Sequence, residues 1–240
     1  MAKEIVLLSG GLDSATCLAD CLQRYGNPNE IMAVNMRYGQ KHQKEIIAAR
    51  EIAKYYGVEL AEYDFSEIFK RSDCALLEQS KKEIEDGSYA EQMARQKKES
   101  EAVMQNVEPV GTYVPFRNGL FLAAAASIAQ SIGATRITIG IHSDDAAGNA
   151  YPDCSVKFAE AIDRAIKIGT GNQVKIHAPF VNLTKAGVVK KGLELGVPYQ
   201  LTWSCYRGGE KACGKCGTCI DRLKAFELNG TIDPLEYFKK

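Results

Sequence analysis

The feature that most constrains this chain is a glycine turn between an apolar strand and a helix. Residues Glu4–Leu8 read as a buried strand, and the run Ser9–Ser14, Ser-Gly-Gly-Leu-Asp-Ser, follows at once. Gly10 and Gly11 have no Cβ, so the backbone there can adopt positive φ values and bring N–H groups close to an anion. The helix that opens here and runs to about Tyr25 adds unpaired donors and the positive end of its dipole. The segment therefore predicts a phosphate-binding site.

This glycine turn differs from a Walker loop. A Walker loop needs a glycine, four further residues, a second glycine, and then lysine followed by serine or threonine. No such run follows an apolar strand in this sequence, so the lysine that grips β- and γ-phosphates is missing. An ordinary glycine-rich turn with a capped helix is the alternative interpretation.

The same turn resembles the pyrophosphate loop of the N-type ATP pyrophosphatases, which transfer the adenylyl group of ATP and release pyrophosphate. The resemblance implies that ATP is cleaved between its α- and β-phosphates. The serines and glycines of the loop would then donate hydrogen bonds to the departing pyrophosphate. Asp13 would either hold Mg²⁺ against those oxygens or contact the nucleotide.

Apolar runs that read as strands alternate along the chain with stretches that read as helices. The predicted strands are Glu4–Leu8, Ile31–Met36, Glu59–Tyr63, Arg136–Gly140 and Val174–Ala178. The predicted helices are Asp13–Tyr25, His42–Tyr56, Asn118–Ile132, Val156–Ile168 and Thr184–Leu195. This alternation predicts an α/β fold, a doubly wound, Rossmann-like parallel sheet of five strands. Ligands of such sheets bind beyond the carboxyl ends of the strands.

The sequence divides into a main domain and a terminal segment. We expect residues 1–200 to form the ATP-binding α/β domain and residues 201–240 to form a metal-binding segment packed on it. Residues 66–107 are highly charged and lack apolar periodicity, so we interpret them as an insertion. A solvated helix pair or mobile excursion is one interpretation of the insertion, and a lid over the active site is the other.

The stretch Asn118–Ile132 is apolar on nearly every side, which predicts the central buried helix. Arg117 and Asn118 stand at its start. A lone arginine at a helix start is usually a surface residue. A guanidinium fork combined with a helix N-terminus nevertheless suits a carboxylate or phosphate well, so we expect both residues to contact ligand.

Four cysteines close to the end of the sequence have the spacing of a metal site. They are Cys205, Cys213, Cys216 and Cys219. Gly214 and Gly217 follow two of them and allow the tight turns that aim successive sulfurs at one centre. We expect one structural Zn²⁺, since four thiolates leave no open coordination position. An iron–sulfur cluster is the alternative, although the bacterial ferredoxin run places its fourth cysteine after the third. The remaining cysteines, Cys17, Cys21, Cys74 and Cys154, read as core residues.

Taken together, these segments resemble the 7-cyano-7-deazaguanine synthase family. The matching segments are Ser9–Ser14, Arg37–His42, Arg117–Asn118 with Phe121–Leu122, Tyr151–Cys154, and Thr202–Cys219. The resemblance implies an ATP-dependent ligase that converts 7-carboxy-7-deazaguanine and ammonia into the nitrile. Adenylated carboxylate and amide intermediates would form, with release of AMP and pyrophosphate. It also implies a homodimer. The ammonia would be free ammonia, because residue 2 is alanine and no cysteine can follow Met1 as a glutaminase nucleophile.

The resemblance also assigns roles to single residues. The predicted ATP-binding residues are Leu8, Ser9, Gly10, Gly11, Leu12, Asp13, Ser14, Tyr38 and His42. The predicted substrate-binding residues are Arg117, Asn118, Asp144, Asp145, Tyr151 and Asp153, since a guanine-like base needs a carboxylate for its N–H edge and a ring to stack on. Asp13, Ser14 and Arg117 are predicted to act in catalysis by positioning and charge.

Two departures from the family concern the expected base pocket. Phe116 stands where the family has a glycine-like residue, and the loop before Ser155 is longer than in the family. Phe116 is also an alternative to Tyr151 as the stacking ring. The acid that the enzyme takes is therefore open, whereas the class of reaction is not.

Composition narrows the function further. Thirty basic residues balance thirty acidic ones, which disfavours nonspecific nucleic-acid binding as the main activity. The apolar run at the N-terminus is too short for a signal peptide or a membrane span, so we expect a cytoplasmic protein. A tRNA-thiolating pyrophosphate-loop enzyme, a related ligase for another carboxylated base, and a nonenzymatic nucleotide-sensing or zinc-dependent module are the alternative functions.

Overall fold

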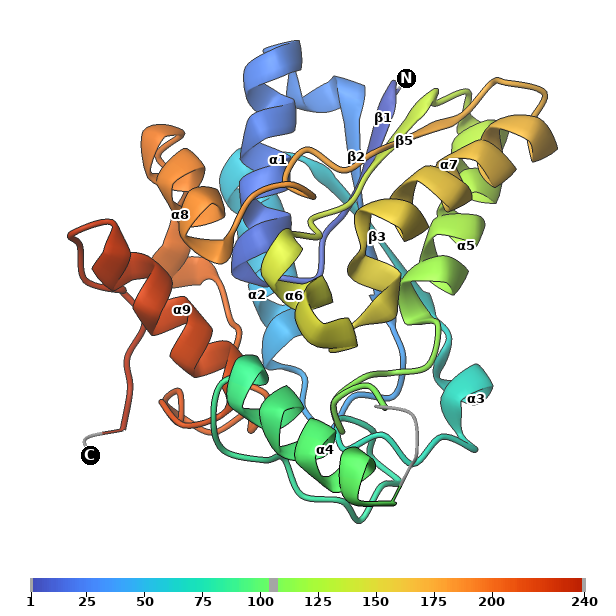
Figure 1. The fold of residues 1–240 in the computed structure, drawn as a ribbon. Coiled ribbons are helices and arrows are strands. Elements are labelled where there is room, and N and C mark those ends of the chain that lie inside the picture. Colours follow the sequence, from blue (N-terminus) through green and yellow to red (C-terminus); the bar gives the residue numbers. More distant parts are fainter. Residues whose placement is uncertain (1, 104–107, 239–240) are drawn as a thin grey trace.

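A five-stranded parallel sheet forms the centre of the molecule (Figure 1). The computed structural model describes residues 2–103 and 108–238. The strands are β1 (Glu4–Leu7), β2 (Ile31–Arg37), β3 (Glu59–Asp64), β4 (Arg136–Thr138) and β5 (Lys175–His177). Their order across the sheet is β3-β2-β1-β4-β5, and every pairing is parallel. The predicted fold class is confirmed, with each expected strand present to within two residues at its ends.

Helices cover both faces of the sheet. On one face lie α1 (Leu12–Tyr25), α2 (Lys44–Tyr56), α8 (Lys185–Glu194) and α9 (Gly217–Leu228), and on the other lie α5 (Arg117–Ile132) and α7 (Val156–Gly169) (Figure 1). The alternation of side chains along β1 explains the two cores, because Val6 and Leu8 pack under α1 while Ile5 packs under α5. Helix α9 was not among the helices predicted from the sequence.

The shorter elements connect these layers. They are the helices α3 (Ser66–Phe69), α4 (Tyr89–Val103) and α6 (Ser143–Ala146), and the single turns η1 (Pro28–Glu30), η2 (Ala147–Asn149), η3 (Pro152–Cys154) and η4 (Tyr199–Leu201). Within its described residues, the predicted insertion contains one four-residue and one fifteen-residue helix. Tyr89 and Met93 of α4 are buried against the core under α5. The helix is therefore anchored, at least at this end, by apolar packing.

Helix α5 is less buried than its apolar sequence predicts. Its buried residues lie along one side and include Leu122, Ala125 and Ala129, whereas Ala123 and Ser127 are exposed. The prediction of a central helix buried on every side is wrong, because small alanines tolerate solvent and α5 forms an outer layer. Helix α1, with eight buried residues, is the more enclosed of the two.

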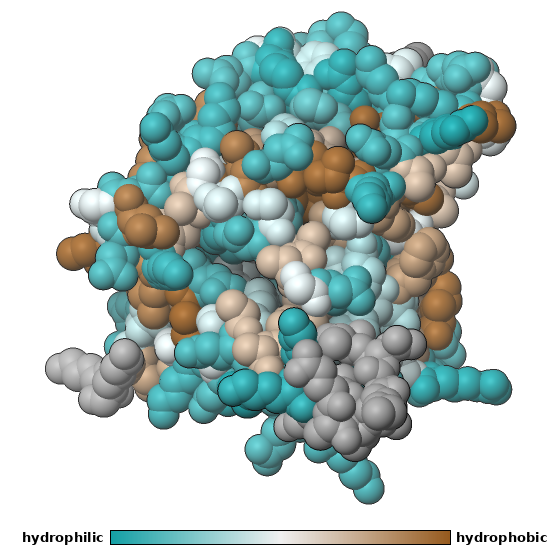
Figure 2. Space-filling model, in the orientation of Figure 1, coloured by the Kyte–Doolittle hydropathy of each residue, from teal (hydrophilic) through white to brown (hydrophobic). Residues whose placement is uncertain are grey.

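Among the described residues, none of the helices is both long enough and apolar enough to span a bilayer. Hydrophilic side chains cover most of the face shown in Figure 2, and apolar side chains occur there in small groups.

A buried arginine ties the last described segment to the domain. Arg222 of α9 is 1% exposed and forms two hydrogen bonds to the Asp233 carboxylate, at 2.7 and 2.9 Å. It also donates to Thr202 Oγ1 at 2.7 Å and to the Tyr199 carbonyl at 3.2 Å. Such a buried guanidinium is tolerated because its donors are paired. The pair fixes residues 199–204 and 233 against one helix.

Candidate active site and candidate metal centre

A cleft of about 1110 Å³, including its open mouth, lies beyond the carboxyl ends of β1, β2 and β4. Strand β1 pairs with β2 on one side and with β4 on the other. The chain therefore continues toward one edge of the sheet after β1 and toward the opposite edge after β4. A crevice at such a point is where open parallel sheets bind ligands. Helices α1, α5 and α8 each bring their first turn to the cleft, through Ser14, Arg117 and Lys185. Three helix N-termini favour an anionic ligand.

Two sets of residues form the two sides of the cleft. We name the side built from strand ends and the helix starts that follow them the sheet wall. The other side comes from segments outside the sheet, and we name it the outer wall. The outer wall consists of Tyr89, Trp203, Ser204, Tyr206 and Thr218.

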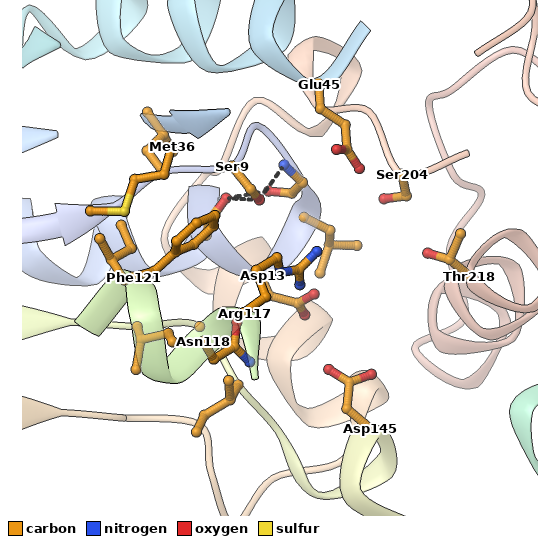
Figure 3. A pocket seen from close by; sticks show the side chains of 18 of the residues that line it. Ser9, Asp13, Met36, Glu45, Arg117, Asn118, Phe121, Asp145, Ser204 and Thr218 are labelled. Atoms are coloured by element: carbon orange, nitrogen blue, oxygen red, sulfur yellow. Dashed lines mark hydrogen bonds between the residues drawn. The ribbon is translucent and has the colours of Figure 1, made fainter. Parts of the chain in front are cut away.

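The glycine turn forms the floor of the sheet wall. Gly10 has φ +94°, and a Cβ there would lie 2.0 Å from the carbonyl oxygen of Glu45, so α2 packs directly on its backbone. Gly11 has φ −78°, so of these two glycines Gly10 is the one that uses the positive φ that glycine allows. The Ser14 hydroxyl lies 3.1 Å from the Ser9 hydroxyl and donates to the Gly11 carbonyl (Figure 3). The turn is therefore already shaped by its own hydrogen bonds.

Asp13 points from the first turn of α1 into the cleft (Figure 3). Its Oδ2 accepts a hydrogen bond from Lys185 Nζ at 2.6 Å, and both side chains are mostly buried. Its Oδ1 is buried without a hydrogen-bond partner. Although burial opposes ionisation, Lys185 and His142 hold the pKa of Asp13 below its usual value. The cleft thus contains a carboxylate with one oxygen that is hydrogen-bonded to Lys185 and one oxygen without a hydrogen-bond partner.

Lys185 was not among the predicted site residues. A signal for it exists in the sequence, because Thr184 reads as a helix cap and a lysine directly after the cap opposes the helix dipole. The Thr184 hydroxyl does cap α8 by accepting from the Gly187 N–H. A cation at that unfavourable position indicates a functional role.

His142, the residue directly before α6, is 1% exposed and lies between two carboxylates. Its Nε2 is 3.2 Å from Asp145 Oδ2 and 3.7 Å from Asp13 Oδ1. Neither approach has hydrogen-bond geometry, and the Nδ1 atom has no partner either. The ring therefore closes the space behind Asp13 and Asp145, both of which line the cleft.

The start of α5 is held by the segment that the sequence placed in the base pocket. The Asp153 carboxylate accepts from the Asn118 N–H at 2.9 Å, and the Asn118 amide donates to the Asp153 carbonyl at 3.2 Å. Burial raises the pKa of Asp153. Arg117 is thereby directed into the cleft, where its guanidinium lies 5.0 Å from the centre of the Tyr38 ring.

The structure brings ten of the predicted ATP- and substrate-binding residues to the cleft. They are Leu8, Ser9, Gly11, Leu12, Asp13, Ser14, Tyr38, Arg117, Asn118 and Asp145. Gly10, His42, Asp144, Tyr151 and Asp153 do not line it, each for a local reason.

These five residues have partners elsewhere. A Cβ on Gly208 would lie 2.3 Å from the His42 ring, so that ring packs against the cysteine-rich segment. Asp144 accepts from the Lys185 N–H at 2.7 Å and so supports α8. The Tyr151 hydroxyl lies 2.6 Å from that of Thr112, behind the wall. Gly10 lies under α2, and Asp153 holds α5, as described above. The side chains of His42, Asp144, Tyr151 and Asp153 therefore lie outside the cleft lining, and Gly10 can reach a ligand only through its backbone. Their predicted contacts with ligand stay predictions.

The other predicted stacking ring, Phe116, also points away from the cleft. Phe116 adopts φ +52°, a left-handed conformation that favours glycine, and is 57% exposed. Its ring covers Gly119, where a Cβ would lie 2.4 Å from it, and meets Phe158 edge to face. The family departure at this position thus changes the outside of α5, not the cleft surface.

Glu45 is a further cleft residue that sequence reasoning missed. It lies in the first turn of α2 and points toward Ser204 of the outer wall (Figure 3). Burial raises its pKa to about 7, and the Arg117 cation only partly offsets this. It follows the predicted loop residues by several positions, so no local motif marks it.

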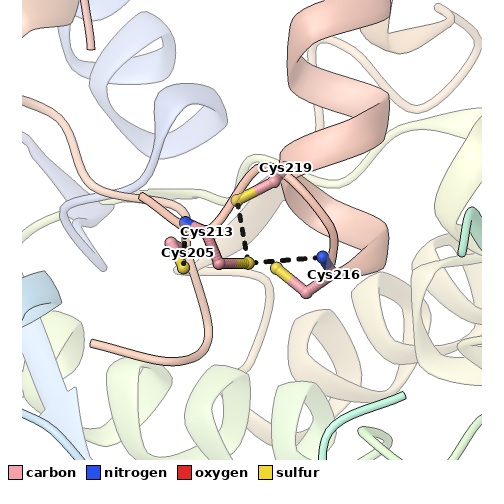
Figure 4. A group of neighbouring side chains, drawn as sticks. All are labelled: Cys205, Cys213, Cys216 and Cys219. Atoms are coloured by element: carbon pink, nitrogen blue, oxygen red, sulfur yellow. Dashed lines mark hydrogen bonds between the residues drawn. The ribbon is translucent and has the colours of Figure 1, made fainter. Parts of the chain in front are cut away.

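The four predicted metal-ligating cysteines come together (Figure 4). All four sulfurs lie within 4.8 Å of one another, and all are free thiols. Four sulfurs around one tetrahedral Zn²⁺ stand about 3.8 Å apart, given a Zn–S distance of about 2.3 Å. The Cys216 and Lys215 N–H groups point to Cys213 Sγ at 3.3 and 3.4 Å, which supports a thiolate. The donor set fits a single ion.

Gly214 and Gly217 of the cysteine-rich segment have different structural roles. Gly214 has φ +68° and makes the predicted tight turn. Gly217 is the first residue of α9, and a Cβ there would lie 2.8 Å from the Tyr89 ring. The prediction that Gly217 turns the chain toward the metal is wrong, because its missing side chain makes room for Tyr89.

Comparison with known proteins decides the family. The model for the queuosine biosynthesis protein QueC matches residues 3–230. The chain belongs to the QueC family. It is 41% identical over 241 residues to the 7-cyano-7-deazaguanine synthase of Thermoplasma acidophilum, covering 99% of this chain and 92% of the relative. It is 39% identical over 234 residues to that of Archaeoglobus fulgidus, covering 97% of this chain and 89% of the relative. The predicted family is confirmed, and the chain is an enzyme of the QueC type.

A solved structure outside the family shares the fold. The U34-tRNA thiolase NcsA from Methanococcus maripaludis, solved with its [4Fe-4S] cluster, superposes with a TM-score of 0.50 at 16% identity. The match covers 95% of this chain and 64% of that one. At this identity the likeness concerns the fold alone. The QueC match favours the ligase over the tRNA-thiolating alternative.

Proposed function

We propose that this QueC family member joins ammonia to 7-carboxy-7-deazaguanine and dehydrates the amide to 7-cyano-7-deazaguanine, consuming ATP at both steps. Relatives named 7-cyano-7-deazaguanine synthase support the product. The observation that carries the reaction is the convergence of three helix N-termini, Arg117 and Lys185 on one cleft, around a carboxylate with a free oxygen. Such a cleft suits a nucleotide and an acid together.

The first half of the proposed reaction is adenylation. The substrate carboxylate attacks the α-phosphorus of ATP, and pyrophosphate leaves with the electron pair of the broken P–O bond. The turn Ser9–Ser14 lies where its N–H groups can receive that pyrophosphate, and Lys185 adds a cation beside it. Arg117 balances the negative charge that develops during the transfer. These residues act by position and charge.

The second half forms and then dehydrates the amide. Ammonia attacks the acyl adenylate, AMP leaves with its electron pair, and a proton is lost. The amide oxygen then attacks a second ATP, displacing pyrophosphate. Loss of both N–H protons of the activated amide and departure of AMP with its electron pair produce the C≡N bond. This order explains why the carboxylate must be activated first, since it otherwise resists attack by ammonia.

Mg²⁺ accompanies ATP in this proposal. The buried, unpartnered Oδ1 of Asp13 is an oxygen ligand of the kind that Mg²⁺ prefers, so the residues present fit the ion. When bound, Mg²⁺ would neutralise charge on the phosphate oxygens. Lys185 keeps the other oxygen of Asp13 occupied and so leaves Oδ1 facing the ligand.

A base subsite follows from the same cleft. Asp145 lines the cleft from α6, and its carboxylate is suited to accept the N–H edge of a guanine-like base. Arg117 is suited to the 7-carboxylate by a fork of two hydrogen bonds. Tyr38 follows β2 and would border the adenosine.

Zn²⁺ is the metal we propose for the four cysteines. Each iron of a four-iron cluster takes its own thiolate, whereas one ion gathers four sulfurs closely, and the sulfurs here lie within 4.8 Å of one another. When bound, Zn²⁺ would supply structural cross-linking. A homodimer rests on the family resemblance, a cytoplasmic location rests on the short apolar run near the N-terminus, and both stay predictions.

A single assay tests the proposed reaction. The purified protein is incubated with ATP, Mg²⁺, ammonium and 7-carboxy-7-deazaguanine, and products are identified by mass spectrometry. We expect AMP, pyrophosphate and a product with the mass of the nitrile. Formation of ADP and phosphate, or no turnover by protein with full metal content, would contradict the proposal. Inductively coupled plasma analysis of the same sample distinguishes zinc from iron.

A further inference from the structure

The outer wall contains a tyrosine that comes from the region between β3 and α5. Tyr89 is the first residue of α4 and is 7% exposed, and it lines the cleft. A capping box fixes this helix start. The Ser88 N–H donates to Glu91 Oε2 at 2.7 Å, and the Glu91 N–H donates to Ser88 Oγ at 3.3 Å. The backbone of Tyr89 is therefore held between two reciprocal hydrogen bonds.

The cysteine-rich segment holds the same helix start from outside. The Gly87 N–H donates to the Lys215 carbonyl at 3.1 Å. Asp86 forms an ion pair with Arg207 at 2.7 Å. Gly217 leaves the space that the Tyr89 ring occupies, as described above. A loop held at this many points is a built part of the cleft, which argues against a lid that opens at this end.

A chain of hydroxyl groups runs from behind the wall to Tyr89. The Thr112 and Tyr151 hydroxyls are 2.6 Å apart, those of Tyr151 and Tyr206 are 3.3 Å apart, and those of Tyr206 and Tyr89 are 2.8 Å apart. Four hydroxyl protons serve three hydrogen bonds, so one proton remains for an acceptor outside the chain.

The buried end of the chain decides where that proton lies. Thr112 is 6% exposed, and Tyr151 is its hydrogen-bond partner among the described residues. If the donors pointed toward Thr112, its proton would be buried without an acceptor, which is unfavourable. The favoured direction therefore runs from Thr112 to Tyr89 and leaves the Tyr89 proton at the cleft. Burial raises the pKa of Tyr89 well above its usual value, so the proton is present at working pH.

We propose that Tyr89 determines specificity by donating a hydrogen bond to the 6-oxo oxygen of the bound base. This rests on the proposed function for the identity of the base. Asp145 lines the same cleft and would accept the neighbouring N–H groups. A donor and an acceptor lining one cleft suit the oxygen and N–H of a guanine edge better than an adenine edge, which has them reversed. Through Tyr89, the region between β3 and α5 then takes part in recognition of the base.

The test compares two ligands on two proteins by calorimetry without ATP. The ligands are 7-carboxy-7-deazaguanine and the same acid without its 6-oxo oxygen. We expect Tyr89→Phe to bind the oxo acid about tenfold more weakly than the wild type does, and to bind the deoxo acid equally well. An equal loss for both ligands, or no loss for either, would overturn the proposal. Tyr56→Phe, which removes a buried hydroxyl far from the cleft, is the matched control and should change neither affinity.

A second variant moves Tyr89 without removing its hydroxyl. Gly217→Ala places a methyl group against the Tyr89 ring and leaves all four cysteines in the chain. With metal content equal to that of the wild type, we expect the same selective loss for the oxo acid. Wild-type affinity for the oxo acid in both variants would refute the role of Tyr89.

Failure of this inference and failure of the proposed function are distinguishable. If wild-type protein produces the nitrile while Tyr89→Phe discriminates the two acids as the wild type does, only the inference fails. If the wild type binds neither acid, both fail.

Discussion

The two walls of the cleft are built in different ways. The sheet wall consists of short segments in which each functional residue follows a strand or opens a helix, as Asp13 and Arg117 do. The outer wall gathers Tyr89, Trp203 and Thr218 from segments far apart in the sequence. Local backbone geometry is sufficient to place the first set, whereas the second depends on long-range contacts and on the cysteine cluster. A substitution in the sheet wall should therefore affect mainly the function of the residue that is changed. Loss of one contact in the outer wall should instead displace several of its residues together.

The largest expected effect comes from removing a metal ligand. Cys219→Ser should abolish metal binding and lower the melting temperature by about 10 °C or more, because metal binding supplies folding free energy to such segments. Loss of affinity for the base should accompany it, since Tyr89 packs on the same segment. Calorimetric melting and metal analysis measure these changes. Cys74→Ala, at a buried cysteine outside the cluster, should retain the metal.

The next effect concerns the sheet wall and separates chemistry from folding. Asp13→Asn should lower the rate of AMP formation by about 100- to 1000-fold, because the charge that faces the phosphates is lost. Metal content and circular dichroism should stay unchanged. The rate is measured by release of AMP under saturating ATP, with Asp20→Asn on the same helix as control. Activity near that of the wild type would remove Asp13 from the mechanism.

A smaller effect tests how tightly the glycine turn is packed. Gly10→Ala should destabilise the protein by about 3 kcal/mol or more, because the new Cβ meets the Glu45 carbonyl and φ is positive. Gly196→Ala is a matched control with φ +65° and no atom within 4 Å, and it should cost only about 1 kcal/mol. Urea unfolding of both variants measures the difference. Equal costs would mean that steric contact with α2 is unimportant.

The smallest effect is a pH dependence at Glu45. Its folded pKa of about 7 exceeds the ordinary glutamate value, so the folded state binds the extra proton and stability falls as pH rises toward 7. Glu45→Gln should therefore melt a few degrees higher than the wild type at pH 8, and at the same temperature below pH 4.5. Melting curves from pH 4 to 8 test this. A constant difference across that range would contradict the raised pKa.

The sequence predicted features that arise from nearby residues. The five strands, the glycine turn, Arg117 and the four cysteines all depend on local periodicity or spacing, and each is found where expected. Glu45, Lys185 and Tyr89 were missed because their positions in the cleft depend on how distant elements pack. The capping box at Ser88 was readable in the sequence, although nothing local shows where its helix would dock. Tyr151 and Asp153 were predicted to contact the base, whereas in the structure their side chains bond Thr112 and Asn118 behind the cleft surface.

The buried pair of Arg222 and Asp233 also affects the order in which parts of the protein can fold during synthesis. The last strand of the sheet ends at His177, so the sheet can form as soon as that residue leaves the ribosome. Residues 199–204, which include part of the outer wall, are held by Arg222, and that guanidinium needs Asp233. The Trp203 N–H of this segment also donates to the Gly10 carbonyl at 2.9 Å, so a nascent chain can have its five strands while the glycine turn and the outer wall are both incomplete. Competence to bind phosphate and competence to bind the base should therefore both wait until Asp233 is available to Arg222.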